Sequence, residues 1–219
     1  MALSTFESQV KLFEEHFFAP ETNTCDPEGV HHEFNQGLHG IKIDFDSVLE
    51  GTALYDEWVA ITAADLDLRY SKSLLGRAVL IGVANGTNRL AKHVACCALD
   101  CGAVALETQK IDKGIIKLTP DSITALHDID PELAIITEDI ATRGTNGASV
   151  VLSTQLNAPP SLRRVEVSHT VERGVPEKLL ELSVPYHSLI IRAMQNYTPE
   201  ECYSNGYCAA GWKLIPYGQ

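Results

Sequence analysis

The chain has 219 residues, of which 45% are hydrophobic and 21% are charged, an ordinary composition for a soluble protein that is long enough to bury a full core. Its net charge of −12, from 29 acidic and 17 basic side chains, opposes binding to the phosphate backbone of nucleic acids. No apolar run approaches the ~20 residues that span a bilayer, and the N-terminus lacks the basic start and apolar stretch of a secretory signal. We therefore expect no nucleic-acid or membrane partner, and the cytoplasm as the compartment.

The first 75 residues are predicted to contain two helices and one short strand. Apolar residues recur at helical spacing through residues 1–20, and Pro20 ends that pattern. Residues 21–30 are rich in Asn, Thr, Asp, Pro and Gly and are typical of a loop. We expect a strand over residues 41–46 and a second helix over residues 47–65, with Leu54, Trp58 and Ile61 on its apolar side.

From residue 77 onward, short apolar runs alternate with amphipathic stretches. This alternation is typical of an α/β fold, in which helices connect the strands of a mainly parallel sheet. We expect strands over 78–83, 103–107, 133–137 and 164–168, and helices over 87–99, 145–156 and 177–182.

Residues 134–147 combine a strand, two carboxylates, a loop of small residues and a helix start. Backbone N–H groups at the start of a helix favour a phosphate, and Gly144 allows the main chain to approach an anion closely. Glu138 and Asp139 would repel that anion, so they need a different partner: sugar hydroxyls, Mg²⁺ or a developing cationic sugar carbon. The alternative is an acidic strand end followed by an ordinary helix, with Thr145 as its N-cap.

The thirteen positions of residues 134–146 resemble the phosphoribosyl-pyrophosphate signature of the type I phosphoribosyltransferases, with Ile140-Ala-Thr-Arg-Gly-Thr-Asn after the two acids. The resemblance implies that Glu138 and Asp139 contact the ribose hydroxyls. It also implies that a loop cradles the 5-phosphate, formed by Ala141, Thr142, Arg143, Gly144 and Thr145. Arg143 departs from the smaller residues that the family more often has there.

A second stretch, Val79 to Ala91, again reads as strand, small-residue loop and helix start. Its position before the signature resembles the pyrophosphate loop of the same family, which implies pyrophosphate binding by Ala84, Asn85, Gly86 and Thr87. The alternative is a structural turn that needs glycine at position 86.

Three lysines, Lys110, Lys113 and Lys117, lie between the two loops in an otherwise acidic chain. A cationic hairpin there could close on pyrophosphate and stabilise its departure, with Lys110 and Lys113 as the candidates. Solvated lysines on an exposed hairpin are the alternative. The orotate enzymes have a longer basic loop at this point, with a histidine that this chain lacks.

Two further stretches, from Phe34 and from His169, resemble the orotate branch of the family, in which the first belongs to a hood over the base. The resemblance implies a base site that includes Gln36 and Arg173. This chain has Asn35 and Gln36 where the orotate enzymes have Lys and Ser, so the cationic partner of a carboxylated base is missing unless Arg173 supplies it.

The six cysteines do not resemble a secreted disulfide framework. Cys96, Cys97 and Cys101 are predicted to be core residues. Cys202 and Cys208 could be imagined as zinc ligands with His187, but two small tail residues are the plainer interpretation. The remaining candidates, His31, His32 and His39, are expected to be surface or hood residues and not ligands.

Together, the residues and the resemblance predict a Rossmann-like type I phosphoribosyltransferase core with a small hood. The expected parts of one compact domain are a helix and hood segment over 1–75, the α/β core over 76–185 and a tail over 186–219. We expect transfer of ribose 5-phosphate from phosphoribosyl pyrophosphate to a nucleobase, and the resemblance to the orotate branch favours an orotate-like pyrimidine. Mg²⁺ would be held mainly by the substrate, with Glu138 or Asp139 as its only candidate protein ligands, and a homodimer is implied. The alternative is a non-catalytic sensor of the same donor.

Overall fold

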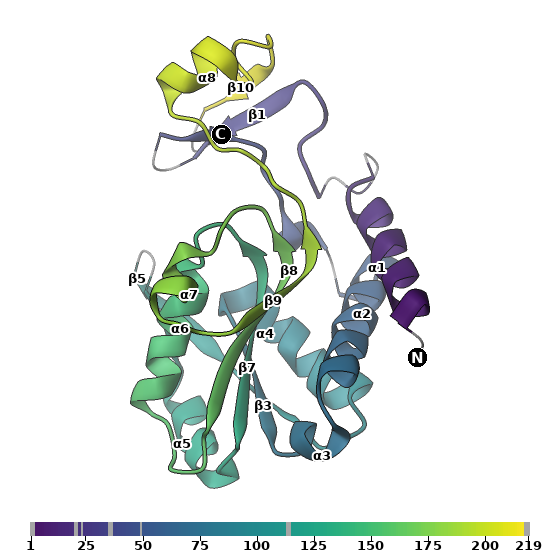
Figure 1. The fold of residues 1–219 in the computed structure, drawn as a ribbon, viewed down its shortest axis with the longest axis vertical. Coiled ribbons are helices and arrows are strands. Elements are labelled where there is room, and N and C mark those ends of the chain that lie inside the picture. Colours follow the sequence, from purple (N-terminus) through teal and green to yellow (C-terminus); the bar gives the residue numbers. More distant parts are fainter. Residues whose placement is uncertain are drawn as a thin grey trace.

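A parallel sheet forms the centre of the molecule in a computed structural model that describes residues 3–19, 22, 24–34, 37–48, 50–112 and 115–216 (Figure 1). The sheet has five strands in the order β4-β3-β7-β8-β9, and each neighbouring pair is parallel. The strands are β3 (Ala78–Gly82), β4 (Val104–Leu106), β7 (Leu133–Ala141), β8 (Arg164–Glu172) and β9 (Tyr186–Ile191).

Successive residues of the central strands point to opposite faces of the sheet. Leu80 and Ile135 join a cluster of buried apolar side chains on one face, whereas Ile81 and Ile136 join a second cluster on the other. The strands are therefore apolar on both faces, as expected where helices cover a parallel sheet from both sides.

Helices cover the two faces in two groups. The first group consists of α1 (Leu3–Phe17), α2 (Ala53–Arg69), α3 (Lys72–Leu75), and α4 (Ala84–His93) with its π-helical continuation η3 (Val94–Ala98). The second consists of α5 (Pro120–Ile129), α6 (Thr145–Leu156) and α7 (Glu177–Glu181), with the hairpin of β5 (Thr108–Asp112) and β6 (Ile115–Leu118) beside them. No described helix is long and apolar enough to span a membrane.

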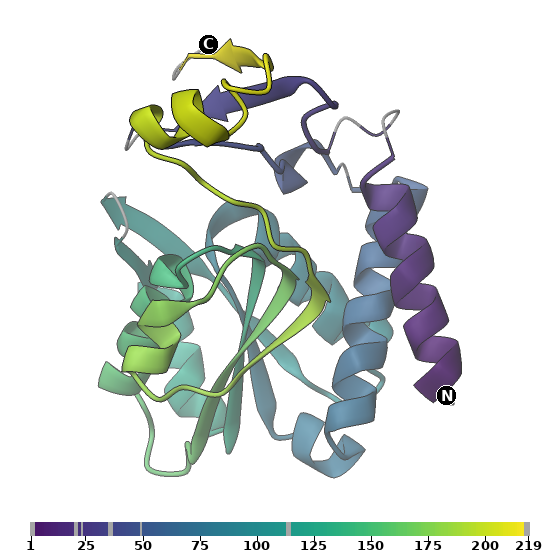
Figure 2. The same ribbon diagram turned by 45° about the horizontal axis from the view of Figure 1, so that its top comes forward.

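Segments from the two ends of the chain form a separate small layer, which we call the hood and define as the described residues of 30–40 and 196–216. Its sheet has the order β10-β1-β2, built from β1 (Val30–Glu33), β2 (His39–Gly40) and β10 (Lys213–Ile215). Beside it lies α8 (Pro199–Asn205), and the 3-10 turn η2 (Phe45–Ser47) follows the N-terminal part of the hood. Figure 2 shows the hood above one end of the parallel sheet, with α1 and α2 side by side along the core.

The predicted α/β class and its flanked parallel sheet are confirmed. The two central strands are longer than predicted, because β7 runs to Ala141 and β8 to Glu172. The segment predicted as a tail contributes β9 to the sheet edge, and α5 was not predicted at all.

The sequence predictions for residues 41–46, for the start of the second helix and for Cys96 are wrong. No strand covers the described residues of 41–46, where Ile43 makes only an isolated bridge to Cys25 before η2. The second helix starts at Ala53, because the Thr52 side chain accepts a hydrogen bond from the Tyr55 N–H and caps it there. Cys96 is exposed in η3 and is therefore not a core residue.

Candidate active site

The junction of β7 and α6 is a helix start without a side-chain cap. Gly144 occupies the N-cap position with a φ of 68°, a left-handed conformation that glycine adopts without strain. Ala148 is the first residue whose N–H bonds back within the helix, to the Gly144 carbonyl. The N–H groups of residues 145–147 thus have no acceptor within the helix. The alternative in which Thr145 is the N-cap is wrong, because Thr145 is the first helical residue.

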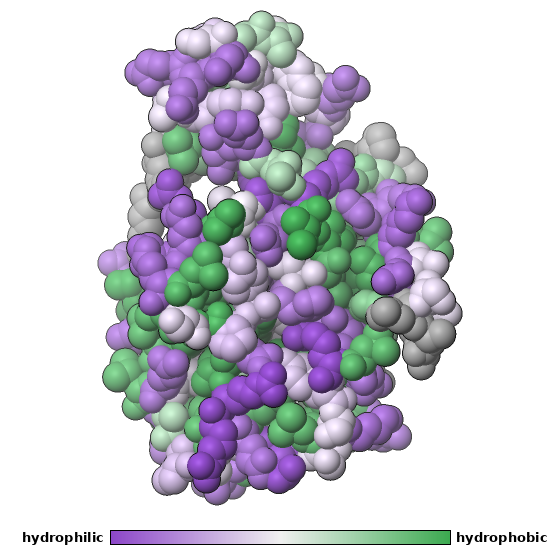
Figure 3. Space-filling view, viewed as in Figure 1, coloured by the Kyte–Doolittle hydropathy of each residue, from purple (hydrophilic) through white to green (hydrophobic). Residues whose placement is uncertain are grey.

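A cavity of about 470 Å³ lies between this junction and the hood. The space-filling view shows a hollow between hood and core on the face turned to the reader (Figure 3). From the core, the cavity is lined by Glu138, Ile140, Thr142, Arg143, Gly144, Thr145, Asn146 and Arg173. From the hood, it is lined by Phe34, Leu38 and Asn196. The cavity therefore joins an anion-attracting helix terminus to a mixed aromatic and polar wall.

Glu138 is a buried carboxylate on the cavity wall, with a residue exposure of 3%. Its Oε2 lies 3.3 Å from Nε2 of His169, the residue beside it in the register of β7 and β8. A Cβ at Gly147 would lie 2.8 Å from that oxygen, so glycine leaves room for the carboxylate next to the first turn of α6. The positive end of the helix dipole, next to this oxygen, favours a negative charge there.

The neighbouring acid, Asp139, is oriented by its own backbone. Its Oδ1 accepts a hydrogen bond of 2.8 Å from the N–H of Ile140. Asp139 is only partly buried, and it is not among the described residues that line the cavity. The two acids of the sequence motif therefore face different surroundings.

Arg173 brings a positive charge to the hood side of the cavity. Its Nη2 donates a hydrogen bond of 2.8 Å to Oδ1 of Asn196, and its guanidinium lies 5.6 Å from the ring centre of Phe34. Burial lowers the pKa of Arg173, although arginine keeps its charge in such surroundings. Within the described part of the chain, Nε of Arg173 has no hydrogen-bond partner. A buried donor of this kind suits an acceptor atom on a ligand.

The other predicted base-site residue, Gln36, lies outside the described residues. Asn196 was missed by the sequence analysis, because no motif surrounds it and only the return of the chain to the hood brings it to Arg173. The resemblance includes His169 but implies no role for it, because its contact with Glu138 depends on the pairing of β7 with β8.

The predicted second loop, Ala84 to Thr87, is the first turn of α4 and not a loop. Ala84 has a φ of 62°, and its N–H donates a hydrogen bond to Oγ1 of Thr108. The Thr87 hydroxyl is buried and donates to the Val83 carbonyl. None of the described residues of this turn lines the cavity. The side chain of Asn85 is not among the parts that the structure describes.

We expect Thr108→Val to disturb this turn. The Thr108 hydroxyl accepts from the partly buried Ala84 N–H and donates to the buried Gly82 carbonyl. Valine would remove both hydrogen bonds, at a total cost of about 1–3 kcal/mol. Chemical denaturation of the variant measures the loss of unfolding free energy, with Thr124→Val on the exposed side of α5 as the control. Equal stability of the two variants would contradict the prediction.

The lysine segment forms the predicted hairpin. Lys110 on β5 is exposed and lies opposite Ile116 on β6, and Lys117 is exposed as well. Lys113 lies outside the described residues. Lys110 and Lys117 do not line the cavity, so a contact of either one with a ligand there requires the hairpin to move.

The tail cysteines do not meet the histidine considered for them. His187 lies on β9, with Nε2 3.1 Å from Oδ1 of Asp65 on α2. Cys202 and Cys208 instead meet His31 and His39 within the hood. The expectation that these two histidines are not candidate ligands is thus revised, because both are buried beside the thiols.

Comparison with known proteins gives matches in structure only. No protein-family model and no curated protein matches the sequence. An orotate phosphoribosyltransferase from Aeropyrum pernix is 18% identical with a TM-score of 0.55, covering 84% of this chain and 93% of its own. An adenine phosphoribosyltransferase from Saccharomyces cerevisiae is 14% identical with a TM-score of 0.53, covering 85% and 99%.

A phosphoribosyltransferase from Corynebacterium diphtheriae is similar at 15% identity and a TM-score of 0.56, over 84% of this chain and 96% of its own. At these identities the matches establish the fold. Because they include both an orotate and an adenine phosphoribosyltransferase, the fold by itself does not select a base.

Proposed function

We propose that this chain, which has the fold of the type I phosphoribosyltransferases, transfers ribose 5-phosphate from phosphoribosyl pyrophosphate to an orotate-like base. The observation that carries the proposal is the single cavity that joins the uncapped start of α6 to Arg173 and the hood. A ligand with a phosphate at one end and a carboxylated base at the other matches both ends of this cavity in charge.

The 5-phosphate is assigned to residues 141–145 and the N–H groups that follow. The positive end of the helix and its unpaired donors favour an anion there. Arg143 is exposed on the cavity rim and adds a positive charge. Gly144 keeps the backbone open, because any larger residue would be strained at its positive φ.

The ribose is assigned to Glu138 and Asp139, whose carboxylates accept hydrogen bonds from hydroxyls. Mg²⁺ belongs to the same proposal, because it prefers oxygen ligands and neutralises pyrophosphate. Glu138 fits a role near such charges, since its Oε2 accepts no hydrogen bond within the described part of the chain and lies on the cavity wall. The carboxylates also balance positive charge that develops on the sugar as the bond from C1 to pyrophosphate breaks.

The base is assigned to the hood side of the cavity, next to Phe34 and Arg173. An aromatic ring and a guanidinium together suit a planar, negatively charged heterocycle. The ring nitrogen of the base then attacks C1 of the ribose while pyrophosphate leaves, and no covalent enzyme intermediate is required. Lys110 and Lys113 are the proposed contacts of the departing pyrophosphate.

We expect Arg173→Gln to raise KM for orotate by about ten- to a hundredfold, because hydrogen bonds to charged groups contribute about 1.5–3 kcal/mol. The increase in KM for uracil, which lacks the carboxylate, should be much smaller. Steady-state kinetics with both bases measures the difference, and Arg77→Gln, which removes an exposed arginine paired with Glu132, is the control. An equal loss for both bases would contradict the assignment of Arg173 to the carboxylate.

A second candidate function is a sensor that binds the donor without chemistry. The observation that favours it is the first turn of α4, where the Ala84 N–H and the Thr87 hydroxyl already have partners within the chain. These groups would have to exchange partners before they bind pyrophosphate.

Calorimetric titration with phosphoribosyl pyrophosphate and Mg²⁺, followed by a pyrophosphate-release assay over orotate, uracil and the purine bases, separates the candidates. Base-dependent release supports the transferase and identifies its acceptor, and binding without release supports the sensor. Absence of binding refutes both. Sedimentation of the same sample tests the proposed homodimer.

A further inference from the structure

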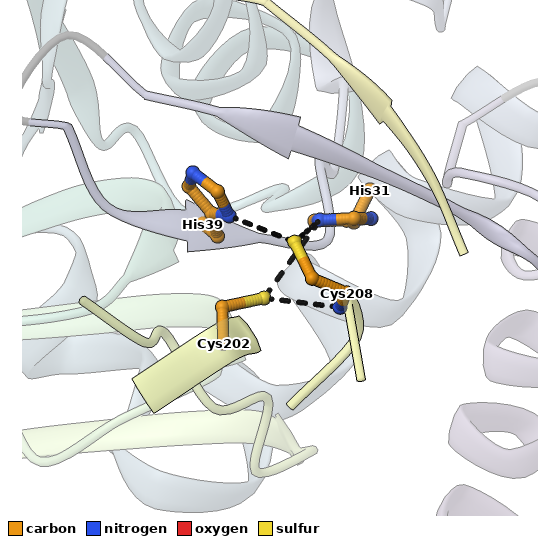
Figure 4. A group of neighbouring side chains, drawn as sticks. All are labelled: His31, His39, Cys202 and Cys208. Carbon is orange, nitrogen blue, oxygen red and sulfur yellow. Dashed lines mark hydrogen bonds between the residues drawn. The ribbon is translucent and has the colours of Figure 1, made fainter. Parts of the chain in front are cut away.

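Four side chains with metal-binding atoms converge inside the hood (Figure 4). His31 and His39 come from the paired strands β1 and β2. Cys202 comes from α8, and Cys208 comes from the turn that follows it. One ligand atom from each residue lies within 4.8 Å of all the others.

The separations of these atoms match those around a tetrahedral zinc ion. With Zn–S and Zn–N bonds of about 2.3 and 2.1 Å, tetrahedral angles place sulfur and nitrogen ligands about 3.6 Å apart. Sγ of Cys208 lies 3.3 Å from Nε2 of His31 and 3.4 Å from Nδ1 of His39. Sγ of Cys202 lies 3.8 Å from the same His31 nitrogen. The three observed sulfur–nitrogen distances thus lie on both sides of the value of about 3.6 Å expected for a zinc site.

The surroundings favour a bound metal over four independent polar groups. His31 and Cys202 have no exposed surface and His39 is only 3% exposed, whereas the neighbouring His32 is partly exposed and contacts Asp26 instead of the thiols. The backbone N–H of Cys208 donates to Sγ of Cys202 over 3.2 Å, a contact that stabilises a thiolate ligand. The rings of Tyr207 and Tyr203 lie beside the imidazoles of His31 and His39, with ring centres 5.5 and 6.1 Å apart.

The hood also lacks the apolar core that would hold it together. Among the described residues, neither of the two large apolar clusters includes a side chain from the hood sheet or from α8. Layers with so little apolar burial commonly depend on a disulfide or a structural metal.

We propose that His31, His39, Cys202 and Cys208 bind one zinc ion that holds the hood together. Two thiolates and two imidazoles would fill all four coordination positions of the ion, as in structural zinc sites. Sulfur and nitrogen ligands also favour zinc over Mg²⁺, which prefers oxygen. The spacing within each pair is wider than in common zinc motifs, because strand pairing joins the histidines and a helix with its turn joins the cysteines.

The zinc site also positions one wall of the cavity. The backbones of His39 and Tyr197 exchange two hydrogen bonds, each 2.9 Å long. Leu38 and Asn196, the residues directly before these two, line the cavity. Metal binding in the hood therefore orders the wall that faces Arg173.

The test is the metal content of the purified protein, measured by mass spectrometry of the elements after expression with zinc in the medium. We expect one zinc per chain in the wild type and its loss in Cys202→Ser with Cys208→Ser, and in His31→Asn. The matched controls are Cys96→Ser, which removes an exposed thiol, and His187→Asn, which removes the histidine that lies against Asp65. Both controls should retain the zinc.

Cobalt substitution in the wild-type chain keeps the proposal testable if the ligand variants fail to fold. A Co²⁺ ion bound by two thiolates and two imidazoles gives intense visible bands typical of tetrahedral coordination, and zinc should abolish them. Wild-type protein without zinc and without these bands, or with a disulfide between Cys202 and Cys208, overturns the proposal. Loss of zinc in His187→Asn but not in His31→Asn overturns the ligand assignment.

Discussion

Glu138→Gln is expected to weaken the binding of phosphoribosyl pyrophosphate with Mg²⁺ by about ten- to a hundredfold, since hydrogen bonds to a charged acceptor contribute about 1.5–3 kcal/mol. The carboxylate lies on the cavity wall with one oxygen that accepts no hydrogen bond within the described part of the chain. Glutamine keeps the shape but removes the charge and replaces one acceptor with a donor, which ribose hydroxyls and a metal cannot use in the same way. Calorimetric titration measures the change.

Two further variants make this result interpretable. Asp139→Asn changes the neighbouring proposed ribose ligand and should also weaken donor binding, whereas Asp128→Asn removes an exposed acid of α5 and should leave it unchanged. Thermal melting checks that the variants remain folded, because Glu138 lies close to His169. Wild-type affinity in both Glu138→Gln and Asp139→Asn would refute the ribose assignment even if the wild type binds the donor.

Trp58→Ala is expected to lower the free energy of unfolding by about 3–5 kcal/mol, as for other fully buried aromatic residues. Trp58 is 1% exposed on α2, and its ring centre lies 4.7 Å from that of Phe45. Its Nε1 donates a hydrogen bond of 2.7 Å to Oγ1 of Thr170 on β8, which would lose its buried donor. Trp58 on α2 therefore contacts both the 3-10 turn η2, through Phe45, and the central sheet, through Thr170.

Chemical denaturation measures this loss, and Leu156→Ala provides the control because Leu156 is 86% exposed at the end of α6. Trp58→Phe keeps one aromatic ring but removes the hydrogen bond and part of the buried ring volume, so we expect a smaller loss of unfolding free energy than in Trp58→Ala. A change below about 1 kcal/mol in Trp58→Ala would show that the site can repack.

Local chemistry accounts for the parts of the site that the sequence predicts well. The helix predicted over 145–156 matches α6, because the small residues around Gly144 interrupt the strand and permit a left-handed turn directly before Thr145. The lysine hairpin was also predicted, since its residues are close in sequence. By contrast, the start of α4 was predicted three residues late, because the unusual φ of Ala84 is supported by Thr108, which is distant in sequence.

Other parts of the site depend on contacts that no short sequence window contains. Parallel pairing brings His169 beside Glu138 across 31 positions of the chain. Arg173 meets Asn196 only because β9 leads the chain from the sheet back into the hood. His31 and Cys202 are 171 positions apart, so the histidines next to the N-terminal loop carried no recognisable metal spacing.

By itself, the sequence determined the alternation of strands and helices, the acidic pair and the glycine directly before α6, because hydrophobic periodicity and glycine conformation act within a few residues. Only the tertiary structure decided the strand order, the burial of Glu138 against His169, the cavity beneath the hood and the cluster of two histidines and two cysteines. These features arise where distant segments pack together, and the free energy that selects such packing depends on the whole chain.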